Sequence, residues 1–162
     1  MGVLNTTAER GKFKMDIHKA LFKSEPIKEM LLGDTSDMSK SEIKEEFKKY
    51  VKSHLFVDEL VTETKTYIFY DVDMPVIRPN IKSCNIYMYL VCHRDILETY
   101  SKEGYYGDRI DILGQMVEDA LINDKDMVNK FGIGKLTLDS ISIYNTTKLY
   151  GCLMTFTIPN FR

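Results

Sequence analysis

The spacing of apolar residues changes near Asp58, and this change limits the possible folds more than any other feature of the chain. Before Asp58, apolar residues recur every three or four positions, which is typical of one face of a helix. After it they alternate with polar residues, as in a strand that buries one face. One later segment, residues 108–124, returns to helical spacing. Helices followed by strands, with one helix between the strands, indicate an α+β fold.

Three helices are predicted in the first part of the chain. The stretch "MDIHKALF" has apolar residues at helical spacing. Ser24 is expected to cap a second helix, which should end at Gly33 because glycine readily adopts the backbone conformation found just after a helix. Ser39 and Glu42 form the S-x-x-E capping-box pattern of a third helix. The apolar stripe of that helix is predicted at Ile43, Phe47, Tyr50 and Val51.

Four strands are predicted after Asp58. The first covers Thr66–Asp73, and the second is a long strand from Cys84 to His93 with one buried face and one half-buried aromatic face. The segments "GIGKLTLDSISIY" and "LYGCLMTFTI" should form an antiparallel pair joined at residues 145–148. The apolar phase shifts within the first of these two, which predicts a β-bulge near residues 139–140.

These elements predict one domain over residues 1–162, with a helical N-terminal segment 1–57 and a sheet-and-helix core 58–162. We expect an α+β fold with an antiparallel or mixed sheet of about four strands. The main helix should start at the cap residue Asp108 and pack on one face of the sheet, and the N-terminal helices are additional. No apolar run approaches the roughly 20 residues that a membrane-spanning helix needs, and the N-terminus lacks the apolar centre of a signal peptide.

The net charge and the positions of the cysteines argue against two kinds of site, a surface that grips DNA and a metal centre. A net charge of −2 and a pI of about 5.9 do not resemble the basic footprint of a protein that grips DNA phosphates. Three cysteines without a secretion signal predict free thiols in a reducing compartment. All three lie in phase with apolar neighbours on predicted strands, where cysteine packs as a small apolar residue. We therefore expect no metal site and no cofactor at Cys84, Cys92, His93 and Cys152.

The stretch "YLVCHRDILETYSKEGYYGDRIDIL" concentrates residues that look reactive. Its His-Arg-Asp triplet resembles the catalytic loop of protein kinases, but the position five after Asp95 is Tyr100 and no D-F-G follows. A chain of 162 residues is also too short for a kinase domain. We interpret the stretch as the end of a buried strand, a crossover loop and the capped start of a helix.

One enzymatic hypothesis remains open. Asp71 and Asp73 lie two positions apart on a strand, so both carboxylates share a face, and with Asp95 or Glu98 they could hold Mg²⁺ for phosphodiester cleavage. The simpler interpretation is a solvated strand end, because this stretch supplies no positioning lysine.

The order of elements resembles a family of virion proteins. A strand ending in "TYIFYDVDMP", a strand ending in "VCHRDIL", the helix "YYGDRIDILGQMVEDAL", then "GIGKLTLDS" and "GCLMTFTIPNF" are similar to neck and tail-completion proteins of tailed bacteriophages. The resemblance covers roughly residues 60–162. It implies a tail terminator or head–tail joining protein in the neck or tail of the virion, assembled in the host cytoplasm. Such a protein forms a ring, commonly sixfold, that caps the tail tube and docks it to the head, without catalysis or cofactor.

The resemblance also implies partners: further copies of the chain, a tail tube protein and a head-completion or connector protein. It implies neither sequence-specific nucleic-acid binding nor a membrane, and mild acidity suits a channel through which DNA must slide. From their positions at the ends of predicted elements, we expect the subunit interface to include Arg94, Asp95, Arg109, Phe161 and Arg162. A non-catalytic cytoplasmic interaction domain unrelated to phages remains a third hypothesis.

Overall fold

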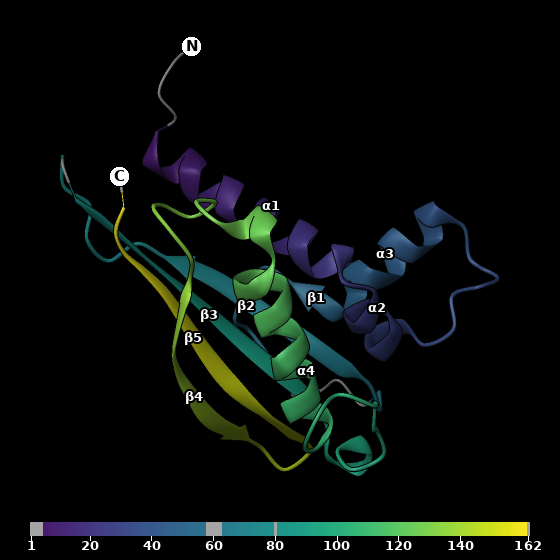
Figure 1. Ribbon diagram of the computed structural model, residues 1–162. Helices are drawn as coiled ribbons and strands as arrows, with labels where there is room; N and C mark the ends of the chain where they lie inside the picture. The colour runs from purple at the N-terminus through teal and green to yellow at the C-terminus, as the bar shows by residue number, and fades with distance from the viewer. Residues whose placement is uncertain (1–4, 58–62, 80, 162) are drawn as a thin grey trace.

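The computed structural model describes residues 5–57, 63–79 and 81–161, with side chains placed as far as residue 158. Four α-helices and five strands follow one another along the chain (Figure 1). In order they are α1 (Thr6–Lys23), α2 (Glu25–Leu32), α3 (Lys40–Tyr50), β1 (Val51–Lys52), β2 (Thr66–Asp73), β3 (Lys82–His93), α4 (Arg109–Glu118), β4 (Thr137–Asn145) and β5 (Leu149–Phe161). The predicted α+β class is confirmed.

The five strands form one mixed sheet in the order β1-β2-β3-β5-β4. All neighbours are antiparallel except β1, which runs parallel to β2. The predicted strand Thr66–Asp73 is confirmed with the same bounds. The short strand β1 was not predicted, and Val51 belongs to it rather than to the apolar stripe of the third helix. Val51 is nevertheless buried, because the chain turns there from α3 into the sheet.

The α-helices α1, α2 and α4 lie on one face of the sheet, where the main core forms (Figure 1). The alternate residues of β3 that face them are fully buried: Cys84, Ile86, Met88, Leu90 and Cys92. From the helices, the same core receives Ile17 and Leu21 of α1, Ile27 of α2, and Leu113 and Val117 of α4. The N-terminal helices thus share a core with the sheet, and α4 packs on one face as predicted.

The predicted helix caps are present. The Ser24 hydroxyl accepts the Ile27 amide at 3.3 Å, and the Ser39 hydroxyl accepts the Glu42 amide at 3.2 Å. At α4 the Asp108 carboxylate accepts two backbone amides, and the carboxylate three residues on accepts the Asp108 amide at 3.0 Å, which completes a capping box. The helical segment predicted to reach residue 124 is α-helical only to Glu118, and a π-helical turn follows over residues 119–123.

The two last strands form the predicted hairpin. Residue 145 pairs with residue 150, and the Thr146 amide donates to the Leu149 carbonyl at 2.8 Å across the turn. The pairing register shifts between Leu138 and Ser140, which confirms the predicted β-bulge. The bulge residue Asp139 accepts a hydrogen bond from the Thr157 hydroxyl at 2.9 Å.

The second face of the sheet is aromatic and only partly covered. Tyr67, Phe69 and Val91 form a small buried cluster there, and the His54 ring lies 5.9 Å from the Phe69 ring. Farther along the face Tyr89 is half-buried and packs on Tyr144, with ring centroids 4.9 Å apart. The predicted half-buried aromatic face is therefore confirmed. Among the described residues, no helix combines the length and the apolar character needed to span a membrane.

Candidate assembly surface

The stretch that looked reactive is held together by Arg109. Its guanidinium donates to the Ile96 carbonyl at 3.0 Å and to the hydroxyls of Thr66 and Thr99 at 3.4 and 3.3 Å. The same group lies 5.0 Å from the centroid of the Tyr100 ring, a distance that allows a cation–π contact. Arg109 thus fastens the crossover loop to the sheet and to the start of α4, which supports the interpretation of this stretch as architecture.

Three other residues expected at a subunit interface lie at two opposite ends of the sheet. Arg94 is exposed and donates to the Thr147 carbonyl at 3.2 Å, beside the turn between β4 and β5. The Asp95 side chain is 73% exposed at the same end. Phe161 pairs with Lys82 at the start of β3, the far end of the sheet. Arg162 lies outside the described residues. The four described residues therefore do not form one contiguous patch, and the role of all five in an interface stays a prediction.

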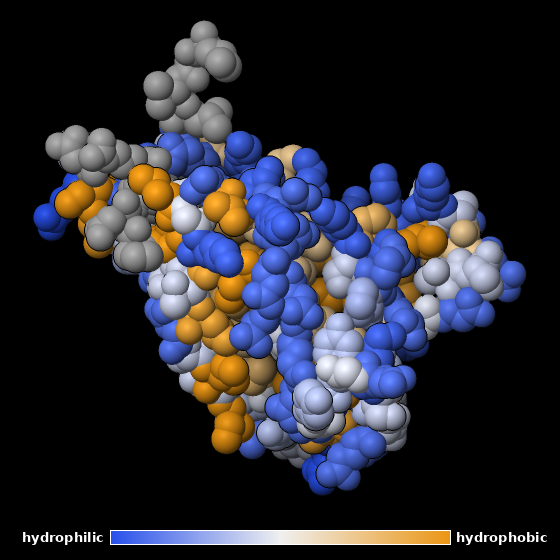
Figure 2. All heavy atoms as spheres, viewed as in Figure 1, coloured by the Kyte–Doolittle hydropathy of each residue, from blue (hydrophilic) through white to orange (hydrophobic). Residues whose placement is uncertain are grey.

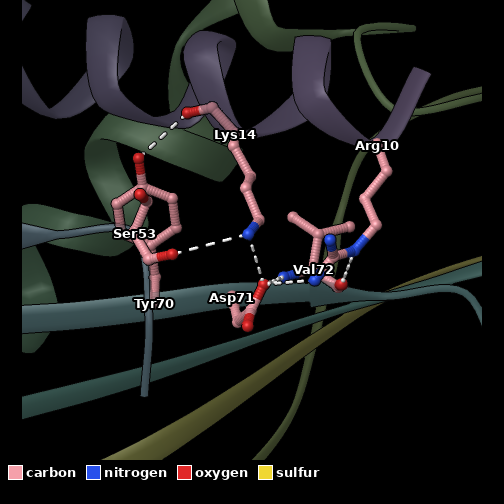
Figure 3. Close-up of polar contacts among 6 residues, drawn as sticks. All are labelled: Arg10, Lys14, Ser53, Tyr70, Asp71 and Val72. Carbon is pink, nitrogen blue, oxygen red and sulfur yellow. Dashed lines mark hydrogen bonds and ion pairs between the residues drawn. The ribbon is translucent and has the colours of Figure 1, made fainter. Parts of the chain in front are cut away.

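Asp71 is bound by two cations from α1 (Figure 3). The Arg10 and Lys14 side chains approach its Oδ1 at 2.7 and 2.8 Å, and Arg10 also donates to the Val72 carbonyl at 2.7 Å. Beside them the Tyr70 hydroxyl donates to the Lys14 carbonyl at 3.0 Å. Burial acts to raise the pKa of Asp71, but hydrogen bonds from Lys14 and the Val72 amide, with the two positive charges, lower it overall. The cluster joins α1 to β2.

The three aspartates of the nuclease hypothesis are not brought together. Asp73 pairs with Asn85 near the start of β3, whereas Asp95 follows the end of that strand at His93. The eight residue-to-residue steps from Asn85 to His93 span roughly 26 Å at about 3.3 Å per step. Asp71 itself already has two cationic partners. Within the described part of the chain, no group of three or more histidine, cysteine, aspartate or glutamate side chains could hold a metal ion.

Replacing Asp71 with asparagine should lower the free energy of unfolding by about 1 kcal/mol at pH 7, because a partly buried ion pair is lost. The pKa of Asp71 is lower in the folded protein, so its contribution is fully present above the ordinary value of 3.8 and disappears as the pH falls through the folded value. Urea unfolding of both proteins between pH 2.5 and 7 should therefore show curves that converge at the acid end.

The control for that measurement is Asp73→Asn, two positions along the same strand. Asp73 is exposed, and it makes no ion pair with any described residue, so its replacement should leave the unfolding free energy within about 0.5 kcal/mol. Equal losses in the two variants would contradict the structural role assigned to Asp71.

The three cysteines are free and lie in the apolar interior or beside it. Burial raises the pKa of Cys84 and of Cys92 to about 12, and the pKa of Cys152 to about 11. Thiols with such pKa values are mostly uncharged at neutral pH and are therefore poor nucleophiles. Cys84 and Cys92 pack as apolar core residues, as predicted, whereas Cys152 is half-buried and lines a groove beside β4.

Two apolar side chains are largely exposed along β4. Ile141 and Ile143 are 62% and 78% exposed. They pair with Met154 and Cys152 of β5 and so belong to the face of the sheet that the helices cover elsewhere. A groove of about 280 Å³ runs between them and α4. Figure 2 shows hydrophobic side chains gathered on this side of the molecule, over the region where Figure 1 places β4 and β5.

The edge that β4 presents is also open. β4 is the last strand of the sheet, so its outer backbone groups have no strand partner among the described residues. Proteins usually protect such edges with charged side chains, proline, β-bulges or very short strands. β4 has nine residues, and its only charged residue, Asp139, lies at its β-bulge, so residues 140–145 carry neither protection. Sequence reasoning placed this strand correctly but missed its exposure, because the alternation of isoleucine and serine is equally typical of a strand with a buried face.

Comparison with known proteins identifies the family of the chain. The family profile named YomW matches residues 16–158. This segment begins within α1, includes its C-terminal part, and extends nearly to the end of β5. The name comes from a Bacillus prophage and points to a phage-associated protein. No curated protein matches the chain. The chain belongs to the YomW family.

Proposed function

We propose that this protein is a structural component of the phage virion, a tail terminator or head–tail joining protein of the neck. In this role, copies of the chain form a ring that caps the tail tube and provides the surface on which the head docks. The ring contacts a tail tube protein on one side and a head-completion or connector protein on the other. The protein performs no chemistry and acts through its surfaces.

The observation that carries the proposal is the open apolar edge at β4. Ile141 and Ile143 are largely exposed beside a groove. Exposed apolar side chains on an unprotected edge strand favour association with another chain. A protein whose work is assembly needs such a surface. Membership of a family with a phage-derived name and the resemblance to tail-completion proteins support the same role.

Deleting the gene from its phage should leave incomplete particles. The kind of particle should show whether the protein terminates tails or joins heads to tails. If the protein terminates tails, electron microscopy of the lysate should show tails of uncontrolled length. If it joins heads to tails, separate filled heads and tails of normal length should accumulate. Infectious titre should fall by several orders of magnitude in either case, because no complete virion forms. Infectious virions of normal shape would overturn the proposal.

Complementation of the deletion links the role to the β4 edge. Wild-type protein supplied in trans should restore virions, whereas Ile143→Lys should not, because a lysine on an edge strand opposes pairing with another chain. The matched control is Ile133→Lys, since Ile133 is 76% exposed but lies in the loop before β4. Restoration by Ile143→Lys would leave the virion role standing and remove β4 as its basis.

A further inference from the structure

A second surface of the molecule also has an exposed apolar side chain, and the charged residues around it are positive. A wide open groove of about 810 Å³ lies between α1 and the segment from the end of α3 through β1. Its apolar part comes from Met15, which is 59% exposed, and from the deeper side chains of Val51 and Tyr70. We call this surface the lysine groove, because Lys14, Lys19, Lys48 and Lys52 also line it.

Most of the positive charge in the lysine groove is available to a partner. Lys14 is engaged by Asp71 at 2.8 Å. Lys48 approaches the Glu45 carboxylate only at 4.0 Å, at the limit of an ion pair. Lys19 and Lys52 make no ion pair with any residue that the structure describes. The chain as a whole has a net charge of −2, so this concentration of lysines is a local feature.

The β4 edge has the complementary pattern. Its apolar centre is the exposed pair Ile141 and Ile143, and the rim formed by α4 carries the acidic side chains Asp111 and Glu118. Asp119 follows directly in the chain and is exposed. Glu118 makes no ion pair within the described residues. An apolar centre with an acidic rim is what an apolar groove with a lysine rim would best accept.

We propose that the lysine groove receives the β4 edge and the α4 rim of a second copy of this chain. The inference rests on the ring proposed above and names the two surfaces that build it. Within one protomer they lie at opposite edges of the sheet, because β1 and β4 are its first and last strands. Four strand spacings of about 4.8 Å separate them by roughly 19 Å. The contact is therefore between molecules.

Such a contact is heterologous, because each protomer offers two different surfaces. Heterologous contacts repeat from copy to copy and close into a ring when the rotation between neighbours allows it. A contact of β4 with β4 would instead join two copies by the same surface and stop at a dimer. Burial of Ile141 and Ile143 supplies apolar contact, and the lysine and acidic rims set which surfaces meet.

Two charge-reversed variants test this pairing. One is Lys19→Glu/Lys48→Glu, with both substitutions on exposed helix positions beside the lysine groove. The other is Glu118→Lys/Asp119→Lys, at the end of the α4 rim and at the exposed residue that follows it. Native mass spectrometry and negative-stain imaging across a concentration series report the assembly of each protein, at low and at high salt. Circular dichroism confirms that each variant is folded.

Wild type should form closed rings that weaken with salt. Each variant alone should assemble at least about tenfold more weakly, because like charges then meet at every junction. An equimolar mixture of the two should restore rings in which the variants alternate, since each rim again meets a groove of opposite charge. The control is Lys125→Glu/Lys135→Glu, which changes the net charge equally at exposed positions outside the groove and should assemble like wild type.

The other outcomes overturn the inference. Assembly of Lys19→Glu/Lys48→Glu at wild-type strength would show that the lysine groove is not a junction. Failure of the mixture to restore rings would show that the two surfaces do not meet each other. A wild type that stays monomeric at millimolar concentration would exclude self-association through them. In all three cases the phage deletion separately decides the virion role, so failure of the interface and failure of the proposed function are distinguishable.

Discussion

Replacing Gly151 with alanine should lower the free energy of unfolding by about 3 kcal/mol, because β3 leaves no space for a side chain at this position. A Cβ atom at Gly151 would overlap the Leu90 carbonyl oxygen and would lie 2.9 Å from the Cα atom of Val91. Both are backbone atoms of the central strand. Relief would require β3 and β5 to separate where Gly151 pairs with Val91. Urea unfolding followed by circular dichroism measures the loss.

Gly11→Ala is the matched control. Gly11 lies inside α1, is exposed, and has no atom within 4 Å of the position that a Cβ would take. Alanine should therefore stabilise the protein by about 0.5–1 kcal/mol, since it favours the helix and reduces the freedom of the unfolded chain. If Gly151→Ala were as stable as wild type, the close approach of β5 to β3 at this pair would be wrong.

Replacing Phe47 with alanine should cost about 4 kcal/mol of unfolding free energy, within the range found when large buried aromatic side chains are removed. Phe47 is fully buried, and no other side chain of α3 is buried. Its ring makes edge-to-face contacts with Phe22 at 5.1 Å and with His18 at 5.5 Å, both from α1. Without it, little apolar contact would hold α3 against α1.

Phe56→Ala is the control, because Phe56 is 73% exposed and its loss should change stability by no more than about 0.5 kcal/mol. A second readout is local. Burial, with the charge of Lys48, holds the pKa of His18 below its ordinary value of 6.5. Removing the Phe47 ring should expose His18 and raise its pKa towards that value in an NMR titration. An unchanged His18 pKa and an unchanged unfolding free energy would contradict this packing.

Most of the local structure could be predicted from the sequence. The capping box at Asp108, the strand Thr66–Asp73 and the bulge between Leu138 and Ser140 were all anticipated and are all present. Each depends on residues close together in the chain: a side chain three positions from an amide, or the alternation of apolar residues along one strand. Such signals do not depend on where the rest of the molecule lies.

The contacts between distant parts of the chain were less predictable. Arg10 and Lys14 reach Asp71 across more than fifty positions of sequence, and no local pattern marks that contact. Asp73 ends β2 and Asp95 follows the end of β3, yet they lie at opposite ends of the sheet because the two strands are antiparallel. The five residues expected at an interface were chosen from the ends of elements, and strand pairing likewise divides the four that the structure describes between two ends of the sheet.

Apart from the short strand β1, the sequence by itself determined which segments are helices, which are strands, and which side of each strand is apolar. Only the tertiary structure decided that β5 lies between β3 and β4, which leaves β4 as the outer strand. Strand order depends on pairing between distant segments and on how much of the sheet the helices can cover. Because α4 does not cover β4, Ile141 and Ile143 remain exposed. The same alternating pattern that predicts a core strand thus leaves apolar side chains exposed at the edge of the sheet.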